Sequence, residues 1–204
     1  MVWNGVQCVN ANALPNFYLI CINQQTTGAQ LATISVIQKS YPSGTSCQNM
    51  FDDLNSQSSL VFQGDQISDI TPFQGFANLT SLDLWNNQIS NFAPLANLPQ
   101  LTSLNLAHNQ ISNIQAITSF KKLTTLYLFE NQIVDISPLA QLTTLTYLDI
   151  RRNQITNLSP ISHITYSAGL LSEENPSSTS MPSGVVIAAP ALATGTSTST
   201  ATQQ

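Results

Sequence analysis

Apolar residues recur through the middle of the chain with a period of 22 residues. Aligning the chain with itself at this offset brings residues 57, 79, 101, 123 and 145 into register as the starts of five units, the signature of a repeat architecture. The fourth and sixth positions are apolar in every unit: Leu60, Leu82, Leu104, Leu126 and Leu148, then Phe62, Leu84, Leu106, Leu128 and Ile150. Because alternate side chains of a strand share a face, each unit is predicted to hold one short strand that buries this pair.

The rest of each unit combines an invariant polar stretch with a turn. The ninth position is Asp65, Asn87, Asn109, Asn131 or Asn153, the tenth is always Gln, and the eleventh is always Ile. Proline follows at Pro72, Pro94, Pro138 and Pro160, with Ala116 in its place in the third unit. The asparagines are predicted to pair with backbone groups that a tight turn would otherwise bury unpaired. Asp65 departs from this column, so the first unit is predicted to be adapted to a cap.

These columns resemble the leucine-rich-repeat family, specifically the 22-residue class found in bacterial internalins and in eukaryotic phosphatase-regulating repeats. The resemblance covers residues 57–166 of the 204. It implies an α/β repeat fold: a right-handed solenoid with a concave parallel sheet built from the Leu-x-Leu segments. The proline-containing halves would form short turns or 3₁₀ pieces on the convex side.

Residues 26–56 are predicted to form a helical cap over the N-terminal end of the solenoid, which would otherwise expose its core. Thr27 with Gln30, and Thr45 with Gln48, have the spacing of capping boxes. They predict helices at 29–41 and 46–55, separated by a Pro-Ser-Gly turn. The apolar residues expected in their buried faces are Leu31, Ile34, Ile37, Met50, Phe51 and Leu54. Residues 1–25 are predicted to be an extension, and apolar and polar residues alternate in places within it, as at 17–22, which suggests a small hairpin in this extension.

Beyond Tyr166 a sixth unit begins, with Leu170 and Asn175 at the fourth and ninth positions. Ser172 stands where an apolar residue belongs, so residues 167–175 are predicted to be a degenerate C-terminal cap. Residues 176–204 hold mainly Ser, Thr, Ala, Pro and Gly and no charge. They have too few large apolar side chains to offset the entropy of ordering, and a disordered tail is predicted.

Charge and composition narrow the classes of partner. Five basic residues stand against ten acidic ones, so no basic field exists to neutralise a nucleic-acid backbone or an anionic membrane surface. No stretch reaches the roughly 18 apolar residues that a membrane-spanning helix needs. Charged residues make up only 7% of the chain, with Asn, Gln, Ser and Thr in their place. That surface favours an extracytoplasmic location, secreted or cell-surface, although no signal peptide is visible at the N-terminus.

The three cysteines, Cys8, Cys21 and Cys47, all precede the repeats. A segment able to turn separates Cys8 from Cys21, so a disulfide between these two is one interpretation, with the third thiol left free. The alternative is three buried, reduced cysteines.

Catalytic chemistry finds no support in the sequence. A hydrolytic triad or a histidine-based metal site would need His108 or His163, and neither has neighbours of the right kind. His163 is predicted to lie at the convex surface, and His108 to lie at the rim of the concave sheet within reach of Glu130. Nucleophile elbows and phosphate-binding glycine loops are absent from the sequence. The chain is therefore predicted to have no enzymatic activity and no cofactor.

Function is expected on the concave strands, where the side chains between the buried leucines point outward. Aromatic residues gather there toward the C-terminal half. With strands about 4.8 Å apart, Trp85 and Phe129 are predicted to stand about 10 Å apart across Ala107, as the walls of a shallow slot. The candidate partner-binding residues are Asp83, Trp85, His108, Tyr127, Phe129, Glu130, Tyr147, Asp149, Arg151 and Arg152.

An apolar centre with a charged rim is typical of protein-binding hot spots, so a protein partner on the concave face is predicted. A carbohydrate- or cell-wall-binding module is one alternative, because aromatic faces beside Asn, Asp and Gln also suit sugar rings. A structural spacer of a larger surface protein is another. The aromatic residues also suit strands by propensity alone, but their clustering argues against that reading. A face of about 400 Å² is half of the standard area per partner, so the cap or loops are expected to contribute.

Overall fold

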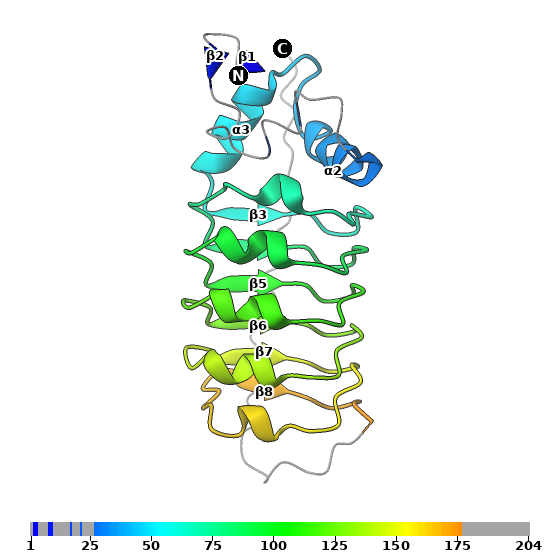
Figure 1. The fold of residues 1–204 in the computed structure, drawn as a ribbon, viewed down its shortest axis with the longest axis vertical. Helices are drawn as coiled ribbons and strands as arrows, with labels where there is room; N and C mark the ends of the chain where they lie inside the picture. Colours follow the sequence, from blue (N-terminus) through cyan, green and yellow to red (C-terminus); the bar gives the residue numbers. More distant parts are fainter. Residues whose placement is uncertain (1, 4–7, 10–16, 18–20, 22–26, 177–204) are drawn as a thin grey trace, which may run out of the picture.

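The repeat region forms a stack of six parallel strands. The computed structural model describes residues 2–3, 8–9, 17, 21 and 27–176. In sequence order, and in this order across the sheet (Figure 1), the strands are β3 (Ser59–Val61), β4 (Ser81–Asp83), β5 (Ser103–Asn105), β6 (Thr125–Tyr127), β7 (Tyr147–Asp149) and β8 (Gly169–Leu171). Each strand residue pairs with the residue 22 positions later. The predicted period and the open solenoid with its parallel sheet are confirmed.

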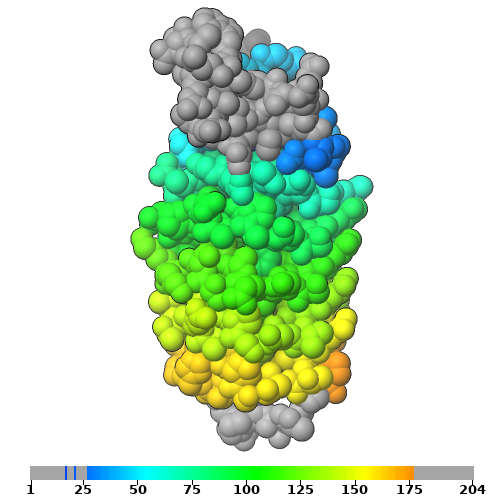
Figure 2. Space-filling view, viewed as in Figure 1, coloured from blue at the N-terminus to red at the C-terminus, as the bar shows by residue number. Residues whose placement is uncertain are grey.

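The opposite side of each coil is a short 3₁₀ helix. These helices are η2 (Thr71–Phe73), η3 (Ala93–Asn97), η4 (Gln115–Ser119), η5 (Ser137–Gln141) and η6 (Ser159–Ile161). Four of the five have proline in their first two positions, where its missing N–H costs no hydrogen bond. A side-chain carboxyl or amide oxygen two residues before each helix's first turn accepts a backbone N–H, as Asn91 does from Ala93. Figure 2 shows the side of the solenoid that carries these helices, with the coils stacked in sequence order from cyan to orange.

The core is a continuous column of apolar side chains between the two faces. Leucines at the fourth and sixth positions, such as Leu104 and Leu106, are fully buried, and so is Ile111 at the eleventh position. Each coil covers only its neighbours' side chains, so burial passes from one coil to the next along the stack.

The ninth-position asparagines are buried and hydrogen-bonded on both sides. The Nδ2 group of Asn109 donates to the carbonyls of Leu84, Leu106 and Ala107, each at 3.1 Å. Its Oδ1 accepts from the backbone N–H of Ile89 at 2.9 Å. Asn87, Asn131 and Asn153 repeat this arrangement in their own units. The predicted role of the asparagine column is therefore confirmed, whereas Asp65 in the first unit is exposed.

Two helices precede the sheet and lie over its N-terminal end (Figure 1): α2 (Gly28–Gln38) and α3 (Cys47–Ser56). Thr27 and Gln30 form the predicted capping box. The second predicted box is wrong, because Ser46 is the N-cap of α3 and accepts from the N–H of Asn49, while the Thr45 hydroxyl donates to the carbonyl of Pro42.

The apolar faces of the two helices differ from expectation at one position. Leu31 is 41% exposed because it lies on the outer side of α2, whereas Ile34, Ile37, Met50, Phe51 and Leu54 are buried. Phe17 is completely buried and was not foreseen. Its ring lies 6.2 Å from that of Phe51 and 5.6 Å from that of Phe76, which belongs to the first repeat. This aromatic contact joins the N-terminal helices to the solenoid.

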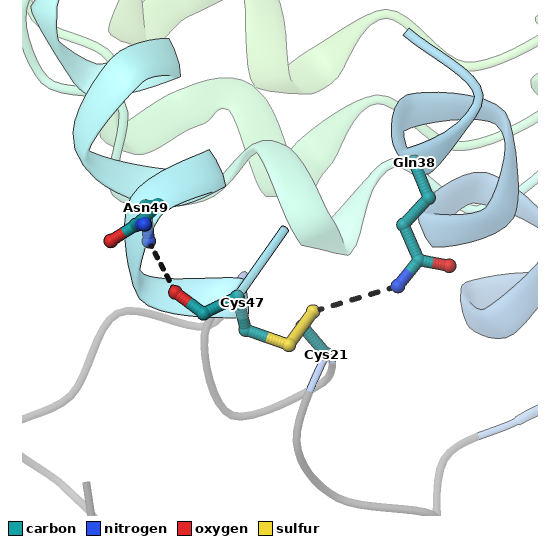
Figure 3. Close-up of a disulfide and its surroundings, with 5 residues drawn as sticks. Cys21, Gln38, Cys47 and Asn49 are labelled. Carbon is teal, nitrogen blue, oxygen red and sulfur yellow. Dashed lines mark hydrogen bonds between the residues drawn. A yellow bond between two sulfur atoms is a disulfide. The ribbon is translucent and has the colours of Figure 1, made fainter. Parts of the chain in front are cut away.

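A disulfide joins Cys21 to Cys47 at the start of α3, with 5.8 Å between their Cα atoms (Figure 3). The expected Cys8–Cys21 pairing is therefore wrong, and so is the alternative of three reduced cysteines. The sequence between Cys8 and Cys21 indicates a turn, but it carries no information on the position of α3, which brings Cys47 to Cys21. The side-chain amide of Gln38 donates to the Cys21 sulfur at 3.9 Å, so the bridge also contacts α2.

The sequence analysis also made predictions for the two ends of the chain. Val2–Trp3 (β1) and Cys8–Val9 (β2) form an antiparallel pair within the predicted extension. Phe17 and Cys21, in the alternating segment 17–22, have helical backbone. At the other end, Asn175 accepts from the N–H of Asn153 and donates to the carbonyl of Ile150. The sixth unit thus keeps both its strand and its asparagine. The tail predicted at 176–204 lies outside the described residues from 177 onward. In the described part, no helix is long and apolar enough to cross a bilayer.

The asparagine column yields the first prediction. Asn109→Ala removes four hydrogen bonds and leaves buried backbone groups unpaired, which should lower the free energy of unfolding by about 3 kcal/mol. Gln110→Ala, at the exposed neighbouring position, is the matched control and should change it by less than about 0.5 kcal/mol. Urea unfolding followed by circular dichroism measures both. Equal stability of the two variants would contradict a structural role for the asparagine.

The disulfide yields the second prediction. Replacing both Cys21 and Cys47 with Ser removes a cross-link across 26 residues and should lower the free energy of unfolding by about 3 kcal/mol, chiefly by freeing the unfolded chain. Cys8→Ser leaves that pair intact and should unfold like the parent protein. Thermal unfolding with and without a reductant tests this, and reductant sensitivity that follows Cys8 instead would show that the pairing is wrong.

Candidate partner-binding surface

The concave face is formed by the third and fifth positions of each unit, which lie within the strand, and by the seventh position, which follows it. Trp85 follows β4 and is 38% exposed. Phe129, which follows β6, and Tyr127 within β6 are half-buried, as is Asp83 in β4. The sequence therefore placed these four side chains on the correct face of the sheet.

The eighth position, directly after this face, has left-handed backbone in every unit. Its residues are Gly64, Asn86, His108, Glu130, Arg152 and Glu174, with φ between 50° and 71°. Glycine and asparagine tolerate this conformation, but it costs other residues about 1 kcal/mol or more. The last four units nevertheless carry His, Glu, Arg and Glu here, at a position where the backbone prefers Gly or Asn.

Those four side chains form one continuous ladder along the rim of the sheet. The Nδ1 atom of His108 contacts the carboxylate of Glu130. The guanidinium of Arg152 binds Glu130 at 2.6 Å on one side and Glu174 at 2.5 Å on the other. These carboxylates, Glu174 first and then Glu130, raise the pKa of Arg152. The predicted contact between His108 and Glu130 is confirmed, and its extension to Glu174 is new.

The His108 ring occupies the place where an open slot was expected. Its centroid lies 5.4 Å from that of Trp85 and 4.9 Å from that of Phe129, edge-on to both. The prediction of a slot open across Ala107 is therefore wrong. Ala107, across which the slot was expected, is itself buried. The rim thus presents a continuous row of three rings.

Both arginines extend this row beyond Phe129. The guanidinium carbons of Arg151 and Arg152 lie 5.1 Å and 5.2 Å from the centroid of the Phe129 ring, within range for cation–π attraction. Arg151 also makes a bidentate pair with Asp149, at 3.0 Å and 2.7 Å. That pairing raises the pKa of the Arg151 guanidinium. Row and ladder together hold the rim side chains in fixed positions.

Two candidate residues are not exposed as expected. Tyr147 and Asp149 are 5% and 3% exposed, so the prediction that they stand open on the concave face is wrong. The Tyr127 ring packs at 5.0 Å from that of Tyr147, and Arg151 covers the Asp149 carboxylate. Burial raises the pKa of Tyr147 to about 12, with smaller effects of the same sign from Asp149 and Tyr127. In this structure Tyr147 packs against Tyr127, and Asp149 holds Arg151.

Asp83 is the carboxylate on the concave face that is held by neutral donors. Its Oδ2 accepts from the side chain of Gln63 at 2.7 Å, and its Oδ1 from the backbone N–H of Trp85 at 2.9 Å. The second bond fixes the turn that carries Trp85. His163 is exposed on the far side of the coil, as predicted, and contacts the carbonyl of Ala140. Within the described residues, no three His, Cys, Asp or Glu side chains gather as a metal site.

Sequence reasoning missed Glu174, although the signal was present. It occupies the eighth position of the sixth unit, and it escaped notice because that unit was interpreted as degenerate. The pairing of residues 22 apart would have placed it beside Arg152.

Comparison with known proteins agrees with this architecture. Residues 77–119 and 121–163 each match the family model described as leucine-rich repeats in two copies. No curated protein matches the chain. Internalin C2 from Listeria monocytogenes is 32% identical, with a TM-score of 0.54, over 70% of this chain and 54% of its own. The internalin inlF of the same organism is 26% identical, with a TM-score of 0.55, over 77% of this chain and 52% of its own.

A leucine-rich-repeat protein of Leptospira interrogans is 25% identical, with a TM-score of 0.58, over 64% of this chain and 34% of its own. The repeat region of the chain is therefore a leucine-rich-repeat solenoid, and internalins are among its structural relatives, as the sequence predicted. The chain spans about half the length of the internalin structures that it matches.

The buried tyrosine yields the third prediction. Because the pKa of Tyr147 rises from 10.0 to about 12 on folding, its contribution to stability is complete below pH 10 and is lost as the pH rises through the folded value. Tyr147→Phe, which cannot ionise, should keep more of its stability between pH 10 and pH 12 than the parent protein. Alkaline unfolding monitored by circular dichroism measures this. Parallel losses in the two proteins would show that Tyr147 is not the titrating group.

Proposed function

We propose that the chain binds a protein partner through the concave face and its rim. Trp85 and Phe129 act as the apolar anchors, with His108 between them, and Arg151 and Arg152 form the charged edge. Extended concave surfaces are the usual binding surfaces of solenoid proteins. Aromatic and arginine side chains at the centre of a contact are the residues that most often dominate binding energy.

The observation that carries this proposal is the composition of the eighth position. Ion pairs between partly exposed side chains add little to stability, so the ladder from His108 to Glu174 does not explain why four units depart from Gly or Asn. Backbone strain that is not offset by a gain in stability is characteristic of functional sites. The ladder lies directly beside the ring row, and both therefore belong to one candidate surface.

The disulfide supports an extracytoplasmic setting for this binding. Such bonds persist in oxidising compartments and are rare in the cytosol. We therefore place the protein at the cell surface or in the secreted fraction. Its very low content of charged residues agrees with that placement.

The fourth prediction tests the anchors. A partner is first identified by proximity labelling in the native host, and its affinity for the purified chain is then measured by calorimetry. Changing both Trp85 and Phe129 to Ala should weaken binding by about 2 kcal/mol or more, roughly thirtyfold. The control is Val134→Ala, which removes an apolar side chain that is 54% exposed away from the rim.

Two outcomes would overturn the proposal. Unchanged affinity of the double variant, with its fold intact by circular dichroism, would remove the rim as the binding site. Saturable binding to a glycan array that is lost in the same double variant would assign the surface to sugars instead.

A further inference from the structure

A cavity of about 400 Å³ lies where the N-terminal helices meet the first strand. The C-terminal ends of α2 and α3, the residues that follow them and strand β3 line it, and its lining residues include Tyr41, Asp53, Leu54, Gln57 and Val61. We call this cavity the cap pocket. Its volume lies within the range of small-ligand sites.

The inner wall of the cap pocket is apolar. Ile37, Leu54, Leu60 and Phe62 are all buried and contribute to it. Val61 also lines the pocket and is 60% exposed, so its aliphatic side chain is accessible to a bound group. The pocket therefore offers an aliphatic chain a surface that removes it from water.

The polar side of the pocket is a carboxylate held in place. The Oδ2 atom of Asp53 accepts from the Tyr41 hydroxyl at 2.7 Å and from the Gln57 side chain at 3.0 Å. Burial, the hydrogen bond to Asp53 and its negative charge raise the pKa of Tyr41, so that hydroxyl remains a donor. None of the four ion pairs of the described residues includes Asp53. Its charge is fixed in position and uncompensated by a cation within that part of the chain.

The geometry points to a lysine or arginine side chain of the protein partner as the occupant of the cap pocket. Its aliphatic stem would lie against Val61 and Leu54, and its cationic head would bind Asp53. A long basic side chain combines these two properties. A sugar would place polar groups against the apolar wall, and an acidic side chain would be repelled by the negative charge of Asp53. This inference rests on the proposed function, since it assumes a protein partner.

The position of the pocket fits a partner already on the concave face. Ser59 and Val61 are outward positions of β3, and both also line the pocket. A polypeptide lying along the sheet therefore reaches the pocket without leaving the surface. The pocket also supplies area that the concave face lacks, because that face offers about half of a standard interface.

The fifth prediction is tested without a partner. The ¹⁵N-labelled chain is titrated with three probes: Nα-acetyl-lysine methylamide, Nα-acetyl-arginine methylamide and the uncharged Nα-acetyl-norleucine methylamide. The two cationic probes should give saturable amide shifts at Tyr41, Leu54 and Val61, with affinities in the millimolar range. Norleucine, which keeps the stem without the charge, should bind about tenfold more weakly, because it cannot pair with Asp53.

Variants locate the interaction. Asp53→Asn should weaken the cationic probes about tenfold. Asp52→Asn, which changes the adjacent carboxylate, exposed like that of Asp53 but outside the pocket, should leave them unchanged. Val61→Lys places a competing cation on an exposed side chain of the pocket lining and should also weaken them.

Shifts that do not saturate, equal shifts with norleucine, or full binding to Asp53→Asn would each overturn the inference. None of these results depends on Trp85 or Phe129. A negative result for the cap pocket can therefore be distinguished from a negative result for the rim as a binding site.

Discussion

The buried amide of the ninth-position asparagine joins each coil of the solenoid to the next, and the remaining features depend on it. Its Nδ2 group satisfies carbonyls of two successive coils, as Asn109 does with Leu84 and Leu106. Without that donor, the tight turn after each strand would bury unpaired backbone oxygens. In the five units that carry the asparagine, the turn places left-handed backbone at the position before it.

This constraint is also what builds the rim. Because the turn repeats every 22 residues, the side chains of His108, Glu130 and Arg152 emerge at the same point of successive coils and contact one another. The buried columns thus determine where rim side chains stand but not which residues they are. Those residues are free to vary, and here they combine aromatic rings with a ladder of charges, a composition suited to recognition more than to stability.

Much of this architecture follows from spacing alone, because a strict period places every buried position. The strands of the five predicted units and the asparagine contacts needed no information beyond the columns, whereas the sixth strand, β8, lies in a unit that was interpreted as a degenerate cap. The failures have a different origin. The His108 ring fills the expected slot, and its residue has a left-handed backbone conformation that apolar periodicity does not encode. The pairing of Cys21 with Cys47, the exposure of Leu31 and the cap pocket all depend on how separate elements meet in space, which no local pattern specifies.

Amide hydrogen exchange tests the central claim most directly, since it reports on the bonds that the asparagines accept. The backbone N–H groups of Ile89, Ile111 and Ile133 each donate to the asparagine of the following unit at 2.9 to 3.0 Å. If the asparagine column holds the coils together, these amides should be among the slowest to exchange in the chain, with similar protection in all three units. Exchange as fast as that of amides at the surface would contradict the account.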